Sequence, residues 1–127
     1  MKMALIRTAG FINLATALIH TAAGQIDLVN PLIDSNLSDQ QKAEWNAVWH
    51  IVTIVLVTTS FMILKAGFGK GETTNLHGLR VLGLMYVLMS VPFIGSGAYF
   101  SVFAPQWVLL LPVGILLLVG ARKRTVG

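Results

Sequence analysis

The sequence predicts an all-α integral membrane protein, a single domain over residues 1–127 with four transmembrane helices in an antiparallel bundle. Three observations predict this class: an apolar composition, four stretches of spanning length, and basic residues in alternate connections. Of the 127 residues, 55% are hydrophobic and 11% are charged, whereas about 25% are charged in a typical soluble domain. A short soluble chain could not cover so much apolar surface, so we expect the bilayer to be its solvent.

Four apolar stretches approach the length of about 20 residues that a helix needs to cross the hydrocarbon. They cover residues 5–26, 43–64, 80–99 and 104–121. The first stretch follows a basic start, as in a signal peptide. However, Asn13 and His20 interrupt its apolar region. We therefore expect this stretch to be retained as the first membrane helix.

The connection between the first two spans, DLVNPLIDSNLS, contains two local signals. Asn30-Pro31 predicts a turn. Ser38 and Gln41 stand three residues apart, which is the spacing of a capping box. The second helix should therefore begin near Asp39.

The third and fourth spans contain residues that disturb a helix. Pro92 should kink the third span, and Gly95-Ser96-Gly97 should either end it or allow close packing. Pro105 fits the first turn of the fourth span, where a missing amide hydrogen is not needed. Pro112 lies inside that short span.

Basic residues gather in alternate connections, before the first span, between the second and third, and after the fourth. Eight of the nine lie there: Lys2, Arg7, Lys65, Lys70, Arg80, Arg122, Lys123 and Arg124. The ninth, Lys42, shares the first connection region with Asp27, Asp34, Asp39 and Glu44. The positive-inside rule therefore predicts that both termini are cytoplasmic.

Two histidines lie at similar depth on the first two helices. His20 is thirteen residues from Arg7, and His50 is fifteen residues from Lys65. These separations correspond to about 20 and 22 Å at the rise of an α-helix. Since a short connection makes the two helices antiparallel neighbours, we expect the two imidazoles to meet in the outer half of the bilayer.

Each histidine belongs to a polar stripe with helical spacing. The stripes contain Asn13, Thr16, His20 and Asp27 on the first helix, and Asn46, His50, Thr53 and Ser60 on the second. Polar faces usually turn away from lipid, so the two stripes should face each other, with Asn13 near the level of Thr59 and Ser60. Tyr86 and Ser90 on the third span either extend this polar interior or pack as ordinary residues.

The stripes predict a candidate ligand-binding set: His20, His50, Asn13, Asp27, Asn46 and Thr53. Three interpretations stay open. The polar residues could hold the helices in register through hydrogen bonds. Alternatively, His20 and His50 could bind a transition metal or a haem iron. A proton-linked or polar-ligand cavity is the third interpretation.

Several classes of chemistry are not supported by the sequence. The absence of cysteine excludes disulfides, thiolate nucleophiles and Cys-ligated metals. No HExxH zinc helix and no Ser/His/Asp order are found, so we assign no catalytic residue. The net charge of +4 is explained by basic helix ends rather than by nucleic acid. The expected surroundings are the lipid bilayer.

The segments LIHTAAG, EWNAVWHIVTI and PQWVLLLPVGILLLVGARKR together are similar to a widespread type of small bacterial membrane protein. Such chains have four spans, a late histidine in the first, Trp-His opening the second, and Pro-Gln-Trp before the last. The resemblance implies a multi-pass location in the bacterial inner membrane and carries over no activity.

We therefore expect a small, non-enzymatic membrane protein with a polar, His-containing pocket near its outer face that binds a metal, haem or a small polar ligand. In a first alternative, the chain is an accessory or assembly subunit of a larger membrane complex or a homo-oligomer, and its His pair is purely structural. In a second alternative, it is a membrane enzyme acting on a lipid or quinone.

Overall fold

The structure, a computed structural model, describes residues 2–69 and 75–122. These residues contain no strand and form four long helices: α1 (Met3–Gly24), α3 (Asp39–Phe68), α4 (Leu76–Phe100) and α5 (Gln106–Gly120). The all-α prediction with four helices is therefore confirmed. Lys70, Lys123 and Arg124, which entered the prediction of orientation, lie outside the described residues.

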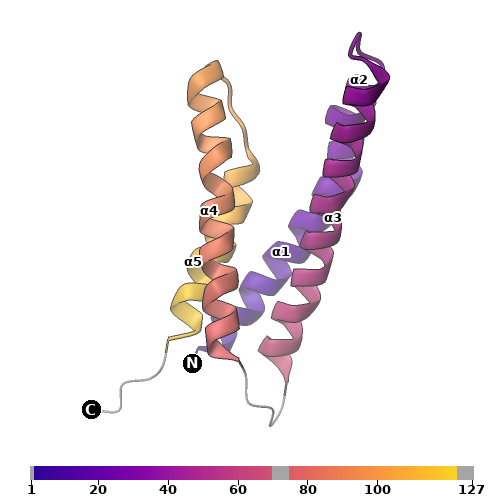
Figure 1. Ribbon diagram of the computed structural model, residues 1–127. Helices are drawn as coiled ribbons and strands as arrows, with labels where there is room; N and C mark the ends of the chain where they lie inside the picture. The colour runs from indigo at the N-terminus through magenta and orange to yellow at the C-terminus, as the bar shows by residue number, and fades with distance from the viewer. Residues whose placement is uncertain (1, 70–74, 123–127) are drawn as a thin grey trace, which may run out of the picture.

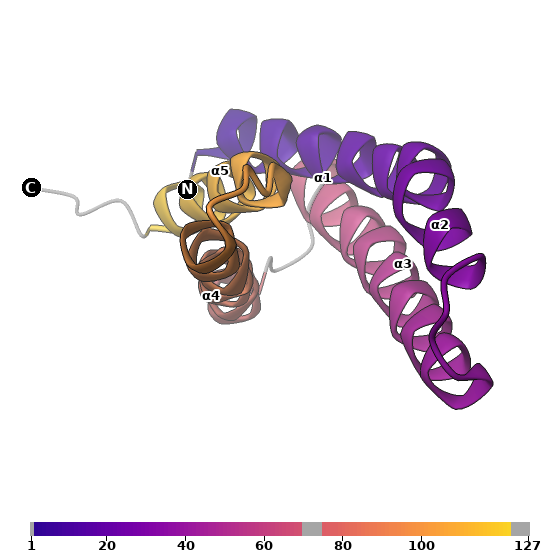
Figure 2. The same ribbon diagram turned by 90° about the horizontal axis from the view of Figure 1, so that it is seen from above.

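The four helices run alternately up and down, so the two ends of the chain lie at the same end of the molecule (Figure 1). Helix α1 packs against α3 and α5, and α4 packs against α5. Helices α3 and α4 do not pack along their lengths, and they diverge towards the end opposite the termini (Figures 1 and 2). The result is an open arrangement of two antiparallel pairs joined through α1 and α5.

The predicted turn at Asn30-Pro31 is wrong, because the chain stays helical there. A π-helical segment, η1 (Gln25–Val29), and a short helix, α2 (Asn30–Ile33), continue α1. The amide of Asn30 donates to the carbonyl of Gln25, five residues back. Pro31 has no amide hydrogen and its ring would press on the carbonyl four residues back. We attribute the wider π turn to the room that it gives this ring.

Helix α3 begins at Asp39, as predicted from its capping box. The Ser38 hydroxyl accepts from the Gln41 amide at 3.3 Å, and Gln41 Oε1 accepts from the Ser38 amide at 3.1 Å. At the other end, Arg7 Nε donates to the Gly67 carbonyl at 2.7 Å, and its guanidinium lies 4.6 Å from the centre of the Phe68 ring. A cation placed at a helix C-terminus satisfies free carbonyls and interacts favourably with the helix dipole.

The segment Gly95-Ser96-Gly97 does not end α4, which continues to Phe100. Its second predicted role, close packing, applies to Gly97. A Cβ atom there would lie 2.9 Å from the Val102 carbonyl oxygen, where the chain turns back towards α5. Helix α4 ends at Phe100, and the residue that caps it, Ser101, has a left-handed φ of 54°.

Helices α4 and α5 approach through two glycines. A Cβ atom on Gly114 would lie 2.7 Å from the Gly83 carbonyl oxygen, and one on Gly83 would lie 3.0 Å from the Gly114 oxygen. The two backbones are therefore in contact, as is common between small residues in membrane helices. Gly83 and Gly114 are both buried in this contact between α4 and α5 and do not lie on the surface.

Three helical stretches among the described residues are long and apolar enough to cross a membrane: Met3–Ile33, Asp39–Phe68 and Leu76–Phe100. Helix α5 is apolar but has 15 residues, about 22 Å. It is shorter than the predicted fourth span because Pro105 occupies its N-cap and Gly120 ends it.

Candidate functional site

A buried amide joins α1 to α3. Asn13 is fully buried, and its Nδ2 lies 3.0 Å from Thr59 Oγ1, 3.0 Å from Ser60 Oγ and 3.2 Å from the Leu56 carbonyl. The two hydroxyls donate to backbone carbonyls one turn back, Thr59 to Val55 and Ser60 to Leu56, each at 2.7 Å. They are therefore free to accept from Asn13. The predicted proximity of Asn13 to Thr59 and Ser60 is confirmed.

The same cluster reaches α4 through Tyr86. Its hydroxyl lies 2.5 Å from Thr59 Oγ1, and the whole side chain is buried. This hydrogen bond connects the α1–α3 pair with the α4–α5 pair. Of the two alternatives that the sequence left for Tyr86, extension of the polar interior is confirmed. Ser90 is also buried, but its hydroxyl donates to the Val87 carbonyl of its own helix.

One acceptor of the cluster has no partner. Asn13 Oδ1 is buried and makes no hydrogen bond with the described residues. Leaving such an atom unpaired costs about 1–3 kcal/mol. The cluster therefore holds the helices together while keeping one acceptor that a donor could occupy.

His20 is held by Trp49 rather than by another imidazole. The two rings are stacked with centroids 3.8 Å apart and planes at 15°. His20 Nε2 lies 3.3 Å from the Trp49 carbonyl oxygen, where it donates if it carries the ring proton. The Trp49 ring also covers Gly24, which has no room for a Cβ atom. These contacts fasten the outer part of α1 to α3.

The other predicted site residues are spread around this contact. Thr53 is half-buried and donates to the Trp49 carbonyl at 3.2 Å. Asn46 is half-buried, whereas His50 and Asp27 are exposed. No group of three His, Asp or Glu side chains suited to a metal occurs within residues 2–69 and 75–122. Ligand binding by these residues stays a prediction.

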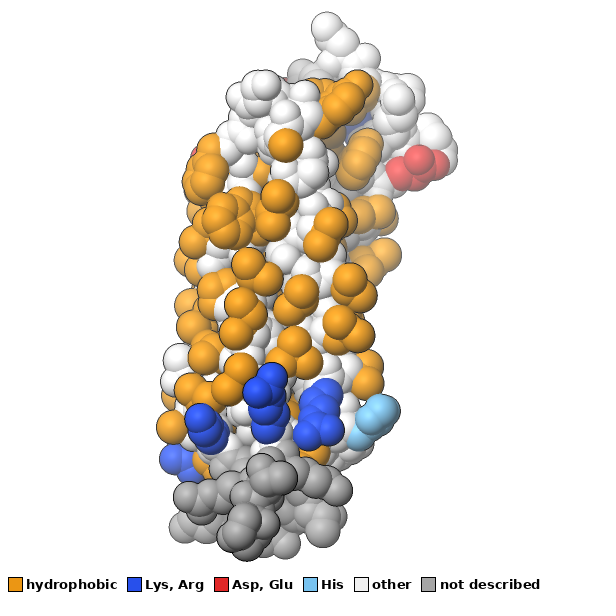
Figure 3. Space-filling model, turned by 90° about the vertical axis from the view of Figure 1, so that its left-hand side faces the viewer, with side chains coloured by type: hydrophobic (Ala, Val, Ile, Leu, Met, Phe, Trp, Pro, Cys, Tyr) orange, Lys and Arg blue, Asp and Glu red, His pale blue; other side chains and the backbone are white. Residues whose placement is uncertain are grey.

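Charged side chains divide between the two ends of the molecule. In Figure 3 most of the Lys and Arg side chains lie near one end, below a broad apolar surface, whereas Lys42 lies in the first turn of α3 at the other end. Two of these arginines close helix C-termini: Arg7 binds the Gly67 carbonyl, and Arg80 Nε donates to the Ala121 carbonyl at 3.1 Å.

Comparisons with protein-family models, with curated proteins and with solved structures give no match. The class of the protein therefore rests on its own fold. It is a helical protein in which three helical stretches are long and apolar enough to cross a membrane, and its helices are joined by buried polar contacts.

Proposed function

We propose that this chain is a non-enzymatic, multi-pass protein of the bacterial inner membrane with both termini in the cytoplasm. It acts through helix contacts within the bilayer, as an accessory or assembly subunit of a larger membrane complex. The observation that carries this proposal is the open side between α3 and α4, which meet at the Thr59–Tyr86 hydrogen bond and diverge towards the end opposite the termini.

The surface supports the membrane location. Large apolar side chains are exposed along the middle of the long helices, including Ile54 at 64%, Phe61 at 67% and Leu88 at 58%. Basic side chains occupy the end where the termini lie. By the positive-inside rule, that end faces the cytoplasm.

The buried polar groups support a structural rather than a catalytic role. Asn13, Thr59, Ser60 and Tyr86 bind one another across three helices, and His20 binds Trp49. Such groups fix how membrane helices pack. What remains for a partner is the side between α3 and α4. Met62 on α3 and Leu82 on α4 line this side. Val55 and Met89 lie seven residues, about two turns, further along the same helix faces.

Photocrosslinking in native membranes tests this proposal. A photoreactive residue is placed at Val55 or Met89, two turns from Met62 and Leu82 on the same helix faces, and at Ile115 on the exposed face of α5 as the control. We expect Val55 and Met89 to yield one defined protein adduct, a partner or a second copy, and Ile115 to yield none. Lipid adducts alone at all three positions would contradict the subunit role.

A second candidate is a ligand site at the His pair. The observation that favours it is the exposure of His50 directly after Trp49, which holds the His20 ring. A metal or haem bound there would give a metal assay or an absorption band that disappears in both His20→Ala and His50→Ala. Metal-free, colourless protein isolated from native membranes would exclude this candidate.

A further inference from the structure

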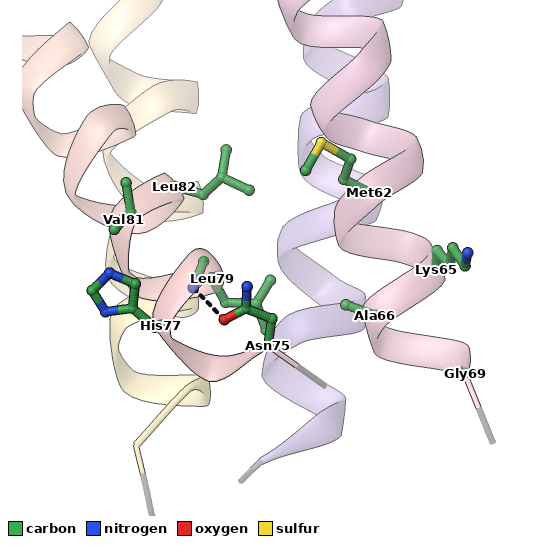
Figure 4. A pocket seen from close by; sticks show the side chains of 10 residues that line it. Met62, Lys65, Ala66, Gly69, Asn75, His77, Leu79, Val81 and Leu82 are labelled. Carbon is green, nitrogen blue, oxygen red and sulfur yellow. Dashed lines mark hydrogen bonds between the residues drawn. The ribbon is translucent and has the colours of Figure 1, made fainter. Parts of the chain in front are cut away.

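A hollow lies between α3 and α4 at the end that carries the basic residues (Figure 4). Its volume is about 600 Å³. The wall formed by α3 includes Met62 and Ala66, and the wall formed by α4 includes Leu79 and Leu82. In Figure 4, Met62 and Ala66 point towards α4, and Leu82 points towards α3. The interior of the hollow is therefore apolar and suits a hydrocarbon chain.

Polar and basic groups surround this apolar interior. Lys65 on α3 and His77 on α4 also line the hollow, with the ends of both side chains directed away from it in Figure 4, and Asn75 lies between the two helices. Asn75 Oδ1 accepts from the Gly78 amide at 2.9 Å, and its NH₂ group, which has two donor hydrogens, makes no hydrogen bond with the described residues. The hollow thus combines an apolar floor with donors at its margin.

Among the described residues, the charged side chains at this end of the molecule are all basic. Arg7 and Arg80 lie at the same end, each bonded to a helix carbonyl. Four of the five acids belong to the first connection region at the opposite end, and the fifth, Glu72, lies outside the described residues. Basic hollows between membrane helices on the cytoplasmic side attract anionic lipid headgroups.

We propose that the hollow binds one anionic phospholipid of the cytoplasmic leaflet. An acyl chain lies between Ala66 and Leu82, and the headgroup phosphate is within reach of Lys65, Asn75 and His77. A long lysine side chain can extend along apolar surface to place its ammonium at the headgroup level. This inference rests on the membrane orientation proposed above. Free phosphate would use the polar groups at the margin alone and would leave the apolar floor uncovered.

Native mass spectrometry of the intact, detergent-purified chain tests the proposal. Phosphatidylglycerol and phosphatidylcholine with identical acyl chains are titrated separately. We expect the first phosphatidylglycerol to bind at least about fivefold more tightly, a difference of about 1 kcal/mol. A hundredfold excess of inorganic phosphate should leave the lipid adduct unchanged.

Two substitutions test the polar margin and the apolar interior of the hollow separately. Lys65→Gln should reduce phosphatidylglycerol binding to the phosphatidylcholine level, whereas Ala66→Phe should fill the floor and weaken both lipids. The matched controls on the same helix are Lys42→Gln and Ala47→Phe, which lie outside the hollow. If Ala66→Phe unfolds, Lys65→Gln alone decides the outcome.

Three results would overturn the proposal: equal binding of both lipids, an equal effect of Lys42→Gln and Lys65→Gln, or displacement of the lipid by phosphate. A separate measurement keeps the two proposals apart. If the chain resists carbonate extraction from membranes but shows no preference for phosphatidylglycerol, only the lipid site fails. A chain that is extracted as a peripheral protein would contradict both.

Discussion

At the residue scale, Asn13 is the side chain on which the packing of three helices depends. Its side-chain nitrogen donates to two hydroxyls and a carbonyl of α3, and one of these hydroxyls, that of Thr59, is also hydrogen-bonded to Tyr86 of α4. Helical spacing and depth were enough to predict that Asn13 lies near the level of Thr59 and Ser60 on facing helices. The contact with Tyr86 could not be predicted with the same certainty, because it depends on the angle at which α4 crosses α3.

Replacing Asn13 with alanine should destabilise the protein. The variant loses the interhelical hydrogen bonds, which in membrane proteins contribute about 0.5–2 kcal/mol each. Thr59 and Ser60 keep their bonds to Val55 and Leu56, so the loss should stay near this range. Thermal unfolding in detergent measures it. Thr8→Ala, an exposed position on the same helix, is the control; equal stability of both variants would contradict the role of Asn13.

The two histidines should respond differently to substitution. His20→Ala removes a ring stacked on Trp49, an interaction of about 0.5–1.5 kcal/mol. His50 is exposed, so His50→Ala should leave the unfolding temperature unchanged. The sequence placed both imidazoles at one depth but could not show that Trp49 would take the position against His20. A larger loss of stability from His50→Ala would refute this assignment.

At the element scale, a sequence signal predicted a helix end correctly where the end depends only on residues within one turn. The capping box of Ser38 and Gln41 is such a case, since it needs no contact beyond one turn. The signal at Asn30-Pro31 was misread because a π turn accommodates the proline within a continuing helix. The sequence contains no pattern that distinguishes this accommodation from a break.

The contact between α4 and α5 yields a sharp prediction at Gly114. A methyl group there would lie 2.7 Å from the Gly83 oxygen and 2.8 Å from the Val87 amide nitrogen, so two backbones would have to separate. Gly114→Ala should therefore destabilise the protein by about 1–3 kcal/mol. The same exchange at Gly95, where no atom lies within 4 Å, should be neutral or stabilising. Thermal unfolding of both variants measures the difference, and equal effects would contradict the close approach.

At the scale of the whole molecule, apolar runs predicted the helices and their number, but not how they are arranged. The open side between α3 and α4 depends on which helix faces are paired, and α1 packs on both α3 and α5. Polar stripes predicted the first of these pairings. The second is made by small and aliphatic residues such as Ile6 and Gly120, which do not stand out in an apolar sequence.

The central claim is that two helical hairpins enter the membrane from the side of the termini. Because the chain has no cysteine, single cysteines can report it directly. We place them at Asn36, between α2 and α3, at Ser101, between α4 and α5, at Asn75 before α4, and after Gly127. An impermeant maleimide should label the first two in intact cells, and the last two only after permeabilisation. Protection of Ser101→Cys, or labelling of the C-terminal cysteine in intact cells, would contradict the account.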